Sequence, residues 1–419
     1  MNRAFYNGIS GTKSHQFGID TWAHNISNIN TNGYKANIPQ FAELFSTKQA
    51  NISEQTPVQS DLGNGSRAHS SAANMDQGTL VKTDKGKDLA IVGEGWFGVQ
   101  SSDGNKMEYT RNGNFTFNAH GDLVTEDGNY LMGTLNPLLT TKRIEKPVIN
   151  YEITTLAGQQ PLKLPLDLVL DGMPTKNVTI TGNLGVEGTT AKYNKKIFNK
   201  DGQEELFQIK IEKSINQPAT GALWNLVATI NDKNGKEVFK SKPAPILFDT
   251  EGHVKAFRPP FINNAGVKLN LDIGKGNSGV VAMGGDAFGK SITADGQEKG
   301  LVTGYEINET GNIMAQFDNG LASSVGVIPL YHFQNDQGLN KVGDTKYSES
   351  PNSGPAFFYL DADNRPTLGS KIAAYTLEKS NTSAAVALTQ LIVMQKAFDA
   401  NAKSITTGDQ MIQEALRMV

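Results

Sequence analysis

Both ends of the chain carry a helical pattern of apolar residues, and this pair of patterns constrains the fold more than any other feature. Within the first thirty and the last forty residues, the pattern repeats at alternating spacings of four and three. This rhythm predicts amphipathic helices with a seam for packing against other helices. The seam positions are Phe5, Ile9, Thr12, Gln16, Ile19, Ala23 and Ile26, and then Ala384, Leu388, Leu391, Gln395, Phe398, Ala402, Ile405, Asp409, Ile412, Leu416 and Val419.

The predicted helices are long enough to project from a small domain, at roughly 40 and 60 Å for a rise of 1.5 Å per residue. Burying one Leu, Ile or Phe of a seam contributes about 1.5–3 kcal/mol, so the two ends should pack with each other or with other chains. One antiparallel pair folded onto its own domain is one interpretation. The polar seam positions Thr12, Gln16, Gln395 and Asp409 instead favour a crowded contact among many helices.

The asparagine-rich stretch "NISNINTNGYK" follows the first helical pattern directly. Asn28, Asn30 and Asn32 are suited to end the helix, because asparagine tolerates the left-handed conformation and its side chain bonds back to the last carbonyls. Gly33 can then adopt a positive φ at the exit. The stretch therefore predicts a turn that directs the chain out of the helix.

Between the two ends, short apolar or alternating runs are separated by turn clusters such as "RNGN" and "EDGN". This pattern is typical of antiparallel β structure. With 419 residues the chain should form two or three compact units. We predict a mainly β fold with α-helical termini and two nested antiparallel β domains. The expected parts are terminal helices at 1–33 and 378–419, linkers at 34–75 and 365–377, a discontinuous β domain at 76–140 and 301–364, and an inserted outer β domain at 141–300. The polar segment 36–75 is expected to order only on assembly.

Composition narrows the class of partner. The 39 Lys and Arg residues nearly balance the 42 Asp and Glu residues, so protein partners are expected rather than nucleic acid. The start, "MNRAFYNGISGTK", has no continuous apolar run of the Sec signal-peptide type. No segment has the 18 uninterrupted apolar residues typical of a membrane-spanning helix, so membrane insertion is not expected.

Enzymatic motifs are weak in this sequence. "GEGWFG", residues 93–98, matches the dinucleotide-binding pattern G-x-G-x-x-G, but a strand pattern follows it where that site requires a helix. The chain has no cysteine, and its six histidines are widely separated. We therefore expect a protein that is not an enzyme, with no catalytic residues, cofactor-binding residues or metal ligands.

Four segments together resemble the bacterial flagellar rod and hook family of axial proteins. They are "HNISNINTNGYK", "GTLVKTDKGKDLAIVGEGWFGVQ", "SVGVIPLYHFQNDQGLNKVGDTKYSES" and "LTQLIVMQKAFDANAKSITTGDQMIQEAL". They occur in the family's order and cover both ends of the chain and both flanks of its middle. Rod proteins are short, and the central segment of about 160 residues favours a hook subunit. A distal rod protein or a minor hook-like protein is the alternative, and a secreted β-rich adhesin or glycan-binding protein is a third hypothesis.

The resemblance implies a self-assembling subunit whose terminal helices form an inner tube around an export channel. The expected polymerisation interface is Phe5, Ile9, Ile19, Ala23, Ile26, Leu388, Leu391, Phe398, Ile405, Ile412 and Leu416. Implied partners are many copies of the chain, the distal rod protein, the hook cap, the hook-length control protein, the hook–filament junction protein and the flagellar type III export apparatus. The implied location is the extracellular flagellum, attached to the basal body and reached without a cleaved Sec signal.

Overall fold

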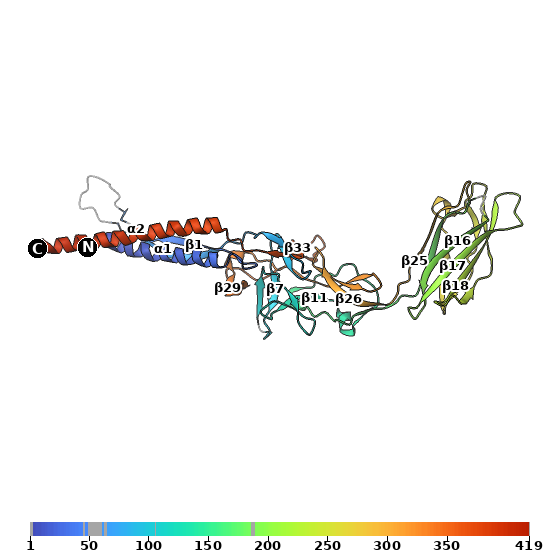
Figure 1. Ribbon diagram of the computed structural model, residues 1–419, viewed down its shortest axis with the longest axis horizontal. Coiled ribbons are helices and arrows are strands. Elements are labelled where there is room, and N and C mark those ends of the chain that lie inside the picture. Colours follow the sequence, from blue (N-terminus) through green and yellow to red (C-terminus); the bar gives the residue numbers. More distant parts are fainter. Residues whose placement is uncertain are drawn as a thin grey trace.

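The computed structural model describes residues 3–44, 47–48, 61–62, 65–104, 106–185 and 189–418. The molecule is elongated, with a helical stalk at one end, a β-rich body in the middle and a separate β sandwich at the other end (Figure 1). Both chain termini lie at the free end of the stalk. The predicted fold class, mainly β with helical termini and two nested β domains, is confirmed.

The stalk contains α1 (Arg3–Ser27) and α2 (Ala384–Arg417), which run antiparallel and side by side (Figure 1). The Ser383 hydroxyl caps α2 by accepting a hydrogen bond from the Val386 N–H. The antiparallel strands β1 (Asn37–Glu43) and β4 (Ser66–Ala73) pack along α1. In the chain segment that connects β1 to β4, β2 (Thr47–Lys48) pairs with β3 (Asp61–Leu62).

The hairpin of β1 and β4 corrects one prediction. Segment 36–75 was expected to order only on assembly, yet these strands pair within a single chain. The Ser14 hydroxyl of α1 also donates a 3.0 Å hydrogen bond to the Ser66 carbonyl. The hairpin orders because strand pairing and the helix surface satisfy its backbone and side-chain polar groups. The remainder of the predicted linker, including residues 49–60, lies outside the described residues.

The body is built around a large, mostly antiparallel sheet whose main path joins strands from both halves of the chain. Two pairs of strands, β6 with β33 and β5 with β34, tie the start of the body to the segment that returns to α2. Its strands are β5 (Leu80–Lys82), β6 (Leu89–Val92), β7 (Phe97–Gln100), β8 (Met107–Thr110), β9 (Thr116–Phe117), β10 (Leu123–Val124), β11 (Tyr130–Leu135), β12 (Arg143–Ile144), β13 (Gln160–Pro161), β14 (Val169–Leu170), β26 (Gly300–Ile307), β27 (Asn312–Phe317), β28 (Ala322–Val327), β29 (Asn340–Gly343), β30 (Lys346–Ser348), β31 (Tyr359–Leu360), β32 (Pro366–Thr367), β33 (Lys371–Ala374) and β34 (Thr376–Glu378), and its short helical turns are η1 (Pro137–Thr141), η2 (Leu156–Gly158) and η4 (Asp336–Gly338).

Two further boundaries differ from the prediction. Segment 365–377, expected to be a linker, supplies strands β32, β33 and β34 of the body. Residues 143–170, assigned to the outer domain, pack in the body, where Ile144, Leu162 and Leu170 are fully buried in its core. Both segments form strands of only two to four residues, which are too short to show a period.

The outer sandwich consists of two sheets that enclose a second core, which contains Phe207, Trp224 and Phe248. Buried residues alternate with more accessible ones along β17 and β18, as expected for strands with one face on a core. One sheet contains β15 (Asn177–Asn183), β22 (Ile262–Asn264), β23 (Val267–Asp272), β24 (Val280–Val281) and β25 (Phe288–Ala294), and the other β16 (Thr190–Phe198), β17 (Glu204–Lys213), β18 (Ala222–Asn231), β19 (Glu237–Lys240), β20 (Ala244–Phe248) and β21 (Val254–Phe257); η3 (Gly276–Ser278) precedes β24.

Two extended segments form the neck between body and outer sandwich (Figure 1). Met173 and Gln297 exchange backbone hydrogen bonds of 2.9 and 3.0 Å across this neck. Most strand pairs in the molecule are antiparallel, but β12–β14, β15–β23 and β15–β24 are parallel. These three short pairings are the exceptions to the predicted antiparallel arrangement.

Candidate functional site

The contact face of α1 is lined by small residues. Gly8, Gly11, Ser14 and Gly18 are buried. A Cβ atom at Gly8 would lie 2.8 Å from Ile405 Cγ1, and one at Gly18 would lie 3.0 Å from the sulfur of Met394. The two helices therefore approach too closely for side chains at these α1 positions.

This close contact places the predicted α1 seam beside the interface rather than at its centre. Phe5, Ile9, Ile19 and Ile26 are half-buried, whereas Ala23 is exposed. The closest approach to α2 is therefore made at glycines rather than at these apolar residues. The predicted polymerisation interface concerns contacts between copies of the chain and stays a prediction. The polar seam position Thr12 bonds within its own helix, to the Gly8 carbonyl at 2.8 Å.

The predicted α2 residues divide into two groups. Leu391, Phe398, Ile405 and Ile412 are half-buried on the side that faces α1. Leu388 and Leu416 are exposed, with 51% and 72% of their surface accessible. Four of these six predicted α2 residues are thus partly covered inside the chain, and the other two are open.

Further exposed apolar side chains flank the contact face of α2 on both sides. At about 100° per residue, Leu388 and Ile392 lie on one flank, and Val386, Val393 and Met411 lie on the other. All five are exposed. A helix that shows apolar flanks on both sides of an occupied face is suited to a bundle of more than two helices.

The helix-exit turn lies between the stalk and the body. The Asn28 amide donates a 2.9 Å hydrogen bond to the His24 carbonyl, which is the expected backward bond. The Asn32 side chain accepts a 3.0 Å hydrogen bond from the Lys379 ammonium, and Asn30 is exposed. None of the three asparagines has a positive φ, so the left-handed conformation expected of them is not used.

Gly33 has the positive φ predicted for it, at +67°. Its N–H donates a 2.8 Å hydrogen bond to the Glu378 carbonyl, which belongs to the strand that returns to the stalk. A Cβ atom at this position would lie 2.5 Å from the Asn112 backbone nitrogen of the body. Gly33 is therefore required both by its backbone conformation and by close approach of the body.

Asn25 was missed by the sequence analysis, although it organises the same turn. It is fully buried near the end of α1. Its side chain donates to the Asn37 carbonyl at 2.7 Å and accepts from the Asn37 N–H at 2.9 Å and the Tyr34 hydroxyl at 3.0 Å. Burial raises the pKa of Tyr34 to about 12. From the sequence, an asparagine this close to a helix end is expected only to terminate the helix. Its role in organising the turn is visible only in the structure.

A buried cluster of charges joins the stalk to the body. Glu378 lies between two cations, with 2.7 Å to the Lys35 ammonium and 3.4 Å to the Arg111 guanidinium. Lys35 also donates to the Asp76 carbonyl at 2.7 Å, and the Gly78 N–H donates to Glu378 at 2.8 Å. Desolvation lowers the pKa values of Lys35 and Arg111, whereas the Glu378 carboxylate acts to raise them.

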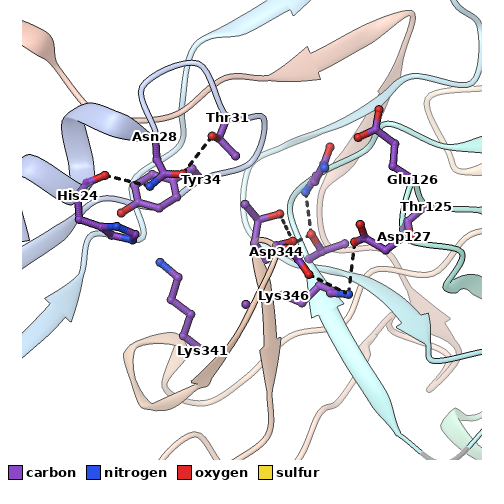
Figure 2. Close-up of a pocket in the computed structure, with 14 residues that line it drawn as sticks. His24, Asn28, Thr31, Tyr34, Thr125, Glu126, Asp127, Lys341, Asp344 and Lys346 are labelled. Atoms are coloured by element: carbon purple, nitrogen blue, oxygen red, sulfur yellow. Dashed lines mark hydrogen bonds and ion pairs between the residues drawn. The ribbon is translucent and has the colours of Figure 1, made fainter.

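We call the region around this charge cluster, where the stalk meets the body, the joint. A polar cavity of about 350 Å³ lies on its surface (Figure 2). His24, Asn28 and Tyr34 line it from the stalk side, and Lys341 and Lys346 line it from the body. The Lys341 ammonium lies 4.5 Å from the centroid of the Tyr34 ring, and desolvation lowers its pKa. The Lys346 ammonium is surrounded by carboxylates of Glu108, Asp127 and Asp344 at 3.4–4.0 Å. The Lys341–Tyr34 contact links the body to the stalk side of the cavity, whereas the Lys346 ion pairs lie within the body.

The dinucleotide-like segment forms a bend that leads into a strand rather than into a helix. Gly93 and Gly95 have φ values of +112° and +116°, and strand β7 follows them. Within the described part of the chain, no group of three or more His, Asp or Glu residues is arranged to hold a metal ion. No described helix is both long and apolar enough to cross a membrane.

Two family profiles match this chain. The one described as "Flagellar hook protein FlgE/F/G D1 domain" matches residues 90–161, in the body. The one described as "Flagellar basal body rod FlgEFG protein C-terminal" matches residues 373–418, which include α2.

Full-length relatives are hook proteins. The chain is 28% identical to the flagellar hook protein FlgE of Borreliella burgdorferi over 462 residues and 25% identical to that of Treponema pallidum over 480 residues, covering the whole of each chain in both cases. It is 24% identical to the FlgE of Salmonella typhimurium, covering 99% of this chain and 100% of the relative.

The fold also matches a solved structure. The crystal structure of the Helicobacter pylori flagellar hook protein FlgE2 aligns with a TM-score of 0.54, covering 71% of this chain and 100% of that one, at 17% identity. The helical termini, the nested β domains, the matched profiles and the full-length similarity agree: the chain is similar throughout to the hook proteins of the bacterial flagellar rod and hook family.

Proposed function

We propose that this chain is the structural subunit of a flagellar hook, polymerising through its stalk into a hollow, flexible tube that couples the rod to the filament. The observation that carries this proposal is the surface of α2. One face of α2 already packs on α1, yet five apolar side chains remain exposed on both flanks: Val386, Leu388, Ile392, Val393 and Met411. Each such side chain gains about 1.5–3 kcal/mol when fully buried, so neighbouring stalks stabilise one another strongly.

Contacts between stalks alone would not pass torque on to the bodies of the subunits. In this proposal the joint supplies the stiffness between stalk and body that this transmission requires. The buried charges of Lys35, Arg111 and Glu378 connect the outgoing and returning segments of the chain to the body. Removing one member of such a buried cluster leaves an uncompensated charge, so the cluster resists separation. The joint therefore transmits twisting of the stalk to the body.

The outer sandwich favours a hook subunit over a rod subunit. Residues 177–294 form a domain with its own core, and the neck joins this domain to the body. Full-length relatives that include this segment are named as hook proteins. A subunit that is structural and not an enzyme agrees with these relatives, and none of them suggests an adhesin.

Assembly at this position implies further partners. We propose contacts with the distal rod protein, the hook cap, the hook-length control protein and the hook–filament junction protein, and delivery by the flagellar type III export apparatus. The proposed location is the hook outside the cell, attached to the basal body. The proposed export uses no cleaved Sec signal.

One experiment tests polymerisation through the stalk. Purified full chain is concentrated and examined by sedimentation and electron microscopy, alongside a Leu388→Asp/Val393→Asp variant. The wild type should form tubes, and the variant should remain monomeric with an unchanged circular dichroism spectrum. Thr407→Asp, an exposed polar position on the side of α2 between the two flanks and away from α1, is the control and should still form tubes. Tubes of normal length from the double variant would contradict assembly through these flanks.

A further inference from the structure

A methionine sulfur lies where three elements of the stalk meet. A Cβ atom placed at Gly18 of α1 would lie 3.0 Å from the sulfur of Met394 and 3.2 Å from its Cγ, both on α2. The same atom would lie 3.3 Å from Cζ of Phe41 on β1. The Met394 sulfur therefore packs on the backbone of Gly18, in a contact to which α1, α2 and β1 all contribute.

This contact is too tight to accept an additional atom on its α1 side. Gly18 is buried, and all three distances from its Cβ position are shorter than the optimal separation of about 3.5–4.0 Å between carbon atoms. The three nearest atoms are a sulfur and two carbons, none of which donates a hydrogen bond. An oxygen on the sulfur would therefore lack both space and a polar partner among these atoms.

The Met394 side chain is nevertheless within reach of a small reagent. It is half-buried rather than enclosed, and Phe41 beside it is 38% exposed. Met132, by contrast, is 6% exposed in the core of the body. Oxidation of a methionine follows its exposure, and the sulfoxide that forms is polar and disrupts apolar contacts. Met394 thus combines access with a contact that a sulfoxide would break.

A displacement at Met394 would also reach the open flanks of α2. Ile392 and Val393 precede it in the helix and are 54% and 51% exposed. They lie on opposite flanks of the α1 contact face. A sulfoxide that pushes α2 away from α1 would change the position of both flanks relative to α1.

We propose that Met394 is an oxidation site, and that its sulfoxide opens the α1–α2 contact of the stalk. The oxidant is hydrogen peroxide. A sulfur lone pair attacks one peroxide oxygen, the S–O bond forms as the O–O bond breaks, and the second oxygen takes up a proton and leaves as water. The sulfur loses two electrons and the peroxide gains them, and methionine sulfoxide reductases reverse the change. The loss of the stalk contact does not depend on polymerisation, whereas its effect on assembly rests on the proposed function.

Peroxide treatment of the full chain tests the site. The chain is treated at low protein concentration, conversion of each methionine is measured by mass spectrometry of its peptides, and the helical circular dichroism signal is followed on heating. The midpoint of the treated wild type should fall by at least about 4 °C. Incubation with both epimer-specific methionine sulfoxide reductases should restore it.

Two leucine variants make the test specific to one sulfur. Met394→Leu conserves the volume of the side chain, so it should fold as the wild type does and lose the response to peroxide. Met418→Leu is the matched control: Met418 is 86% exposed at the end of α2, and this variant should respond as the wild type does. Met394→Gln, which places a polar group at the contact, should lower the midpoint without peroxide.

Three results would overturn the proposal. The first is equal loss of midpoint in treated wild type and treated Met394→Leu. The second is an unreacted Met394 under conditions that convert Met418 completely, because the sulfur would then be out of reach. The third is a wild-type midpoint for Met394→Gln.

Assembly provides a separate readout. Treated wild type should need a severalfold higher concentration to form tubes than untreated wild type, whereas treated Met394→Leu should not. Untreated wild type that forms no tubes would contradict the proposed function, and the thermal measurement on the stalk would still decide whether Met394 is the oxidation site.

Discussion

The ammonium nitrogen of Lys35 lies 2.7 Å from a carboxylate oxygen of Glu378, although 343 positions separate the two residues in the chain. Both side chains are about 1% exposed. Lys35 follows the exit turn of α1, and Glu378 ends the strand that leads back to α2. The pair therefore closes the joint at the point where the chain leaves the stalk and where it returns.

Glu378→Gln should destabilise the body and the joint by about 3–5 kcal/mol, because the neutral amide leaves Lys35 and Arg111 as uncompensated buried cations. The measurement is urea unfolding at low protein concentration. Glu309→Gln is the control: its ion pair with Lys371 is more than 70% exposed on both sides, and its loss should cost no more than about 1 kcal/mol. Equal shifts in the two variants would show that the buried cluster contributes no more than a surface pair.

His332 should make the body sensitive to acid. Its imidazole is 3% exposed, its Nε2 lies 2.8 Å from the Leu368 carbonyl, and burial lowers its pKa from the ordinary value of 6.5. Asp336, Glu94 and Arg111 are the charged groups that face it. Below pH 6.5 the unfolded chain gains a proton on this residue that the folded chain does not. The stabilisation is therefore complete above pH 6.5 and is lost as the pH falls toward the folded-state pKa.

The measurement is the free energy of unfolding from pH 7 to pH 5. One differentially bound proton contributes a slope of at most about 1.4 kcal/mol per pH unit. His332→Gln should reduce the slope in this window, whereas His69→Gln, at an exposed position, should leave it unchanged. Identical slopes for His332→Gln and the wild type would show that the residue takes no part in the acid response.

Local patterns in the sequence were sufficient for the fold class. The seven-residue rhythm located both terminal helices, and turns such as "RNGN", where the Asn112 side chain accepts from the Asn114 N–H, marked the boundaries between strands. What could not be predicted depends on distant partners. Strands β33 and β34 have at most four residues and are recognisable only through their pairing with β6 and β5.

The residues of the candidate site likewise divide into those with a local sequence signal and those that depend on distant partners. Gly33 was predictable because a positive φ is a local requirement. The contact face of α1 was not, because a sequence pattern weights apolar side chains and gives glycine no weight, whereas the structure selects Gly8, Gly11 and Gly18 for their small size. Lys35 and Glu378 carry no local signal of burial, since each is a charged residue that becomes buried only through the other.

Gly33→Ala should weaken the joint more than its backbone conformation alone requires. Alanine at a positive φ costs about 1–2 kcal/mol, and here its Cβ would also clash with the Asn112 backbone at 2.5 Å. Gly128→Ala separates the two effects, because Gly128 has a φ of +80° and nothing within 4 Å of the added Cβ. Urea unfolding should show a larger loss for Gly33→Ala, and tube formation should fail for that variant only. Equal losses would mean that the body does not restrict this position.

Gly8→Ala should weaken the stalk even though alanine favours a helix by about 1 kcal/mol over glycine. The added Cβ would lie 2.8 Å from Ile405 Cγ1 and 3.1 Å from the Asn401 carbonyl oxygen, so the helices must separate. Overpacking of this kind costs about 1–3 kcal/mol. Thermal unfolding of the helical circular dichroism signal should therefore occur at a lower temperature. Asp20→Ala, at an exposed α1 position, is the matched control and should leave the midpoint unchanged or raise it. A rise in both variants would show that α1 and α2 do not approach closely enough to require glycine.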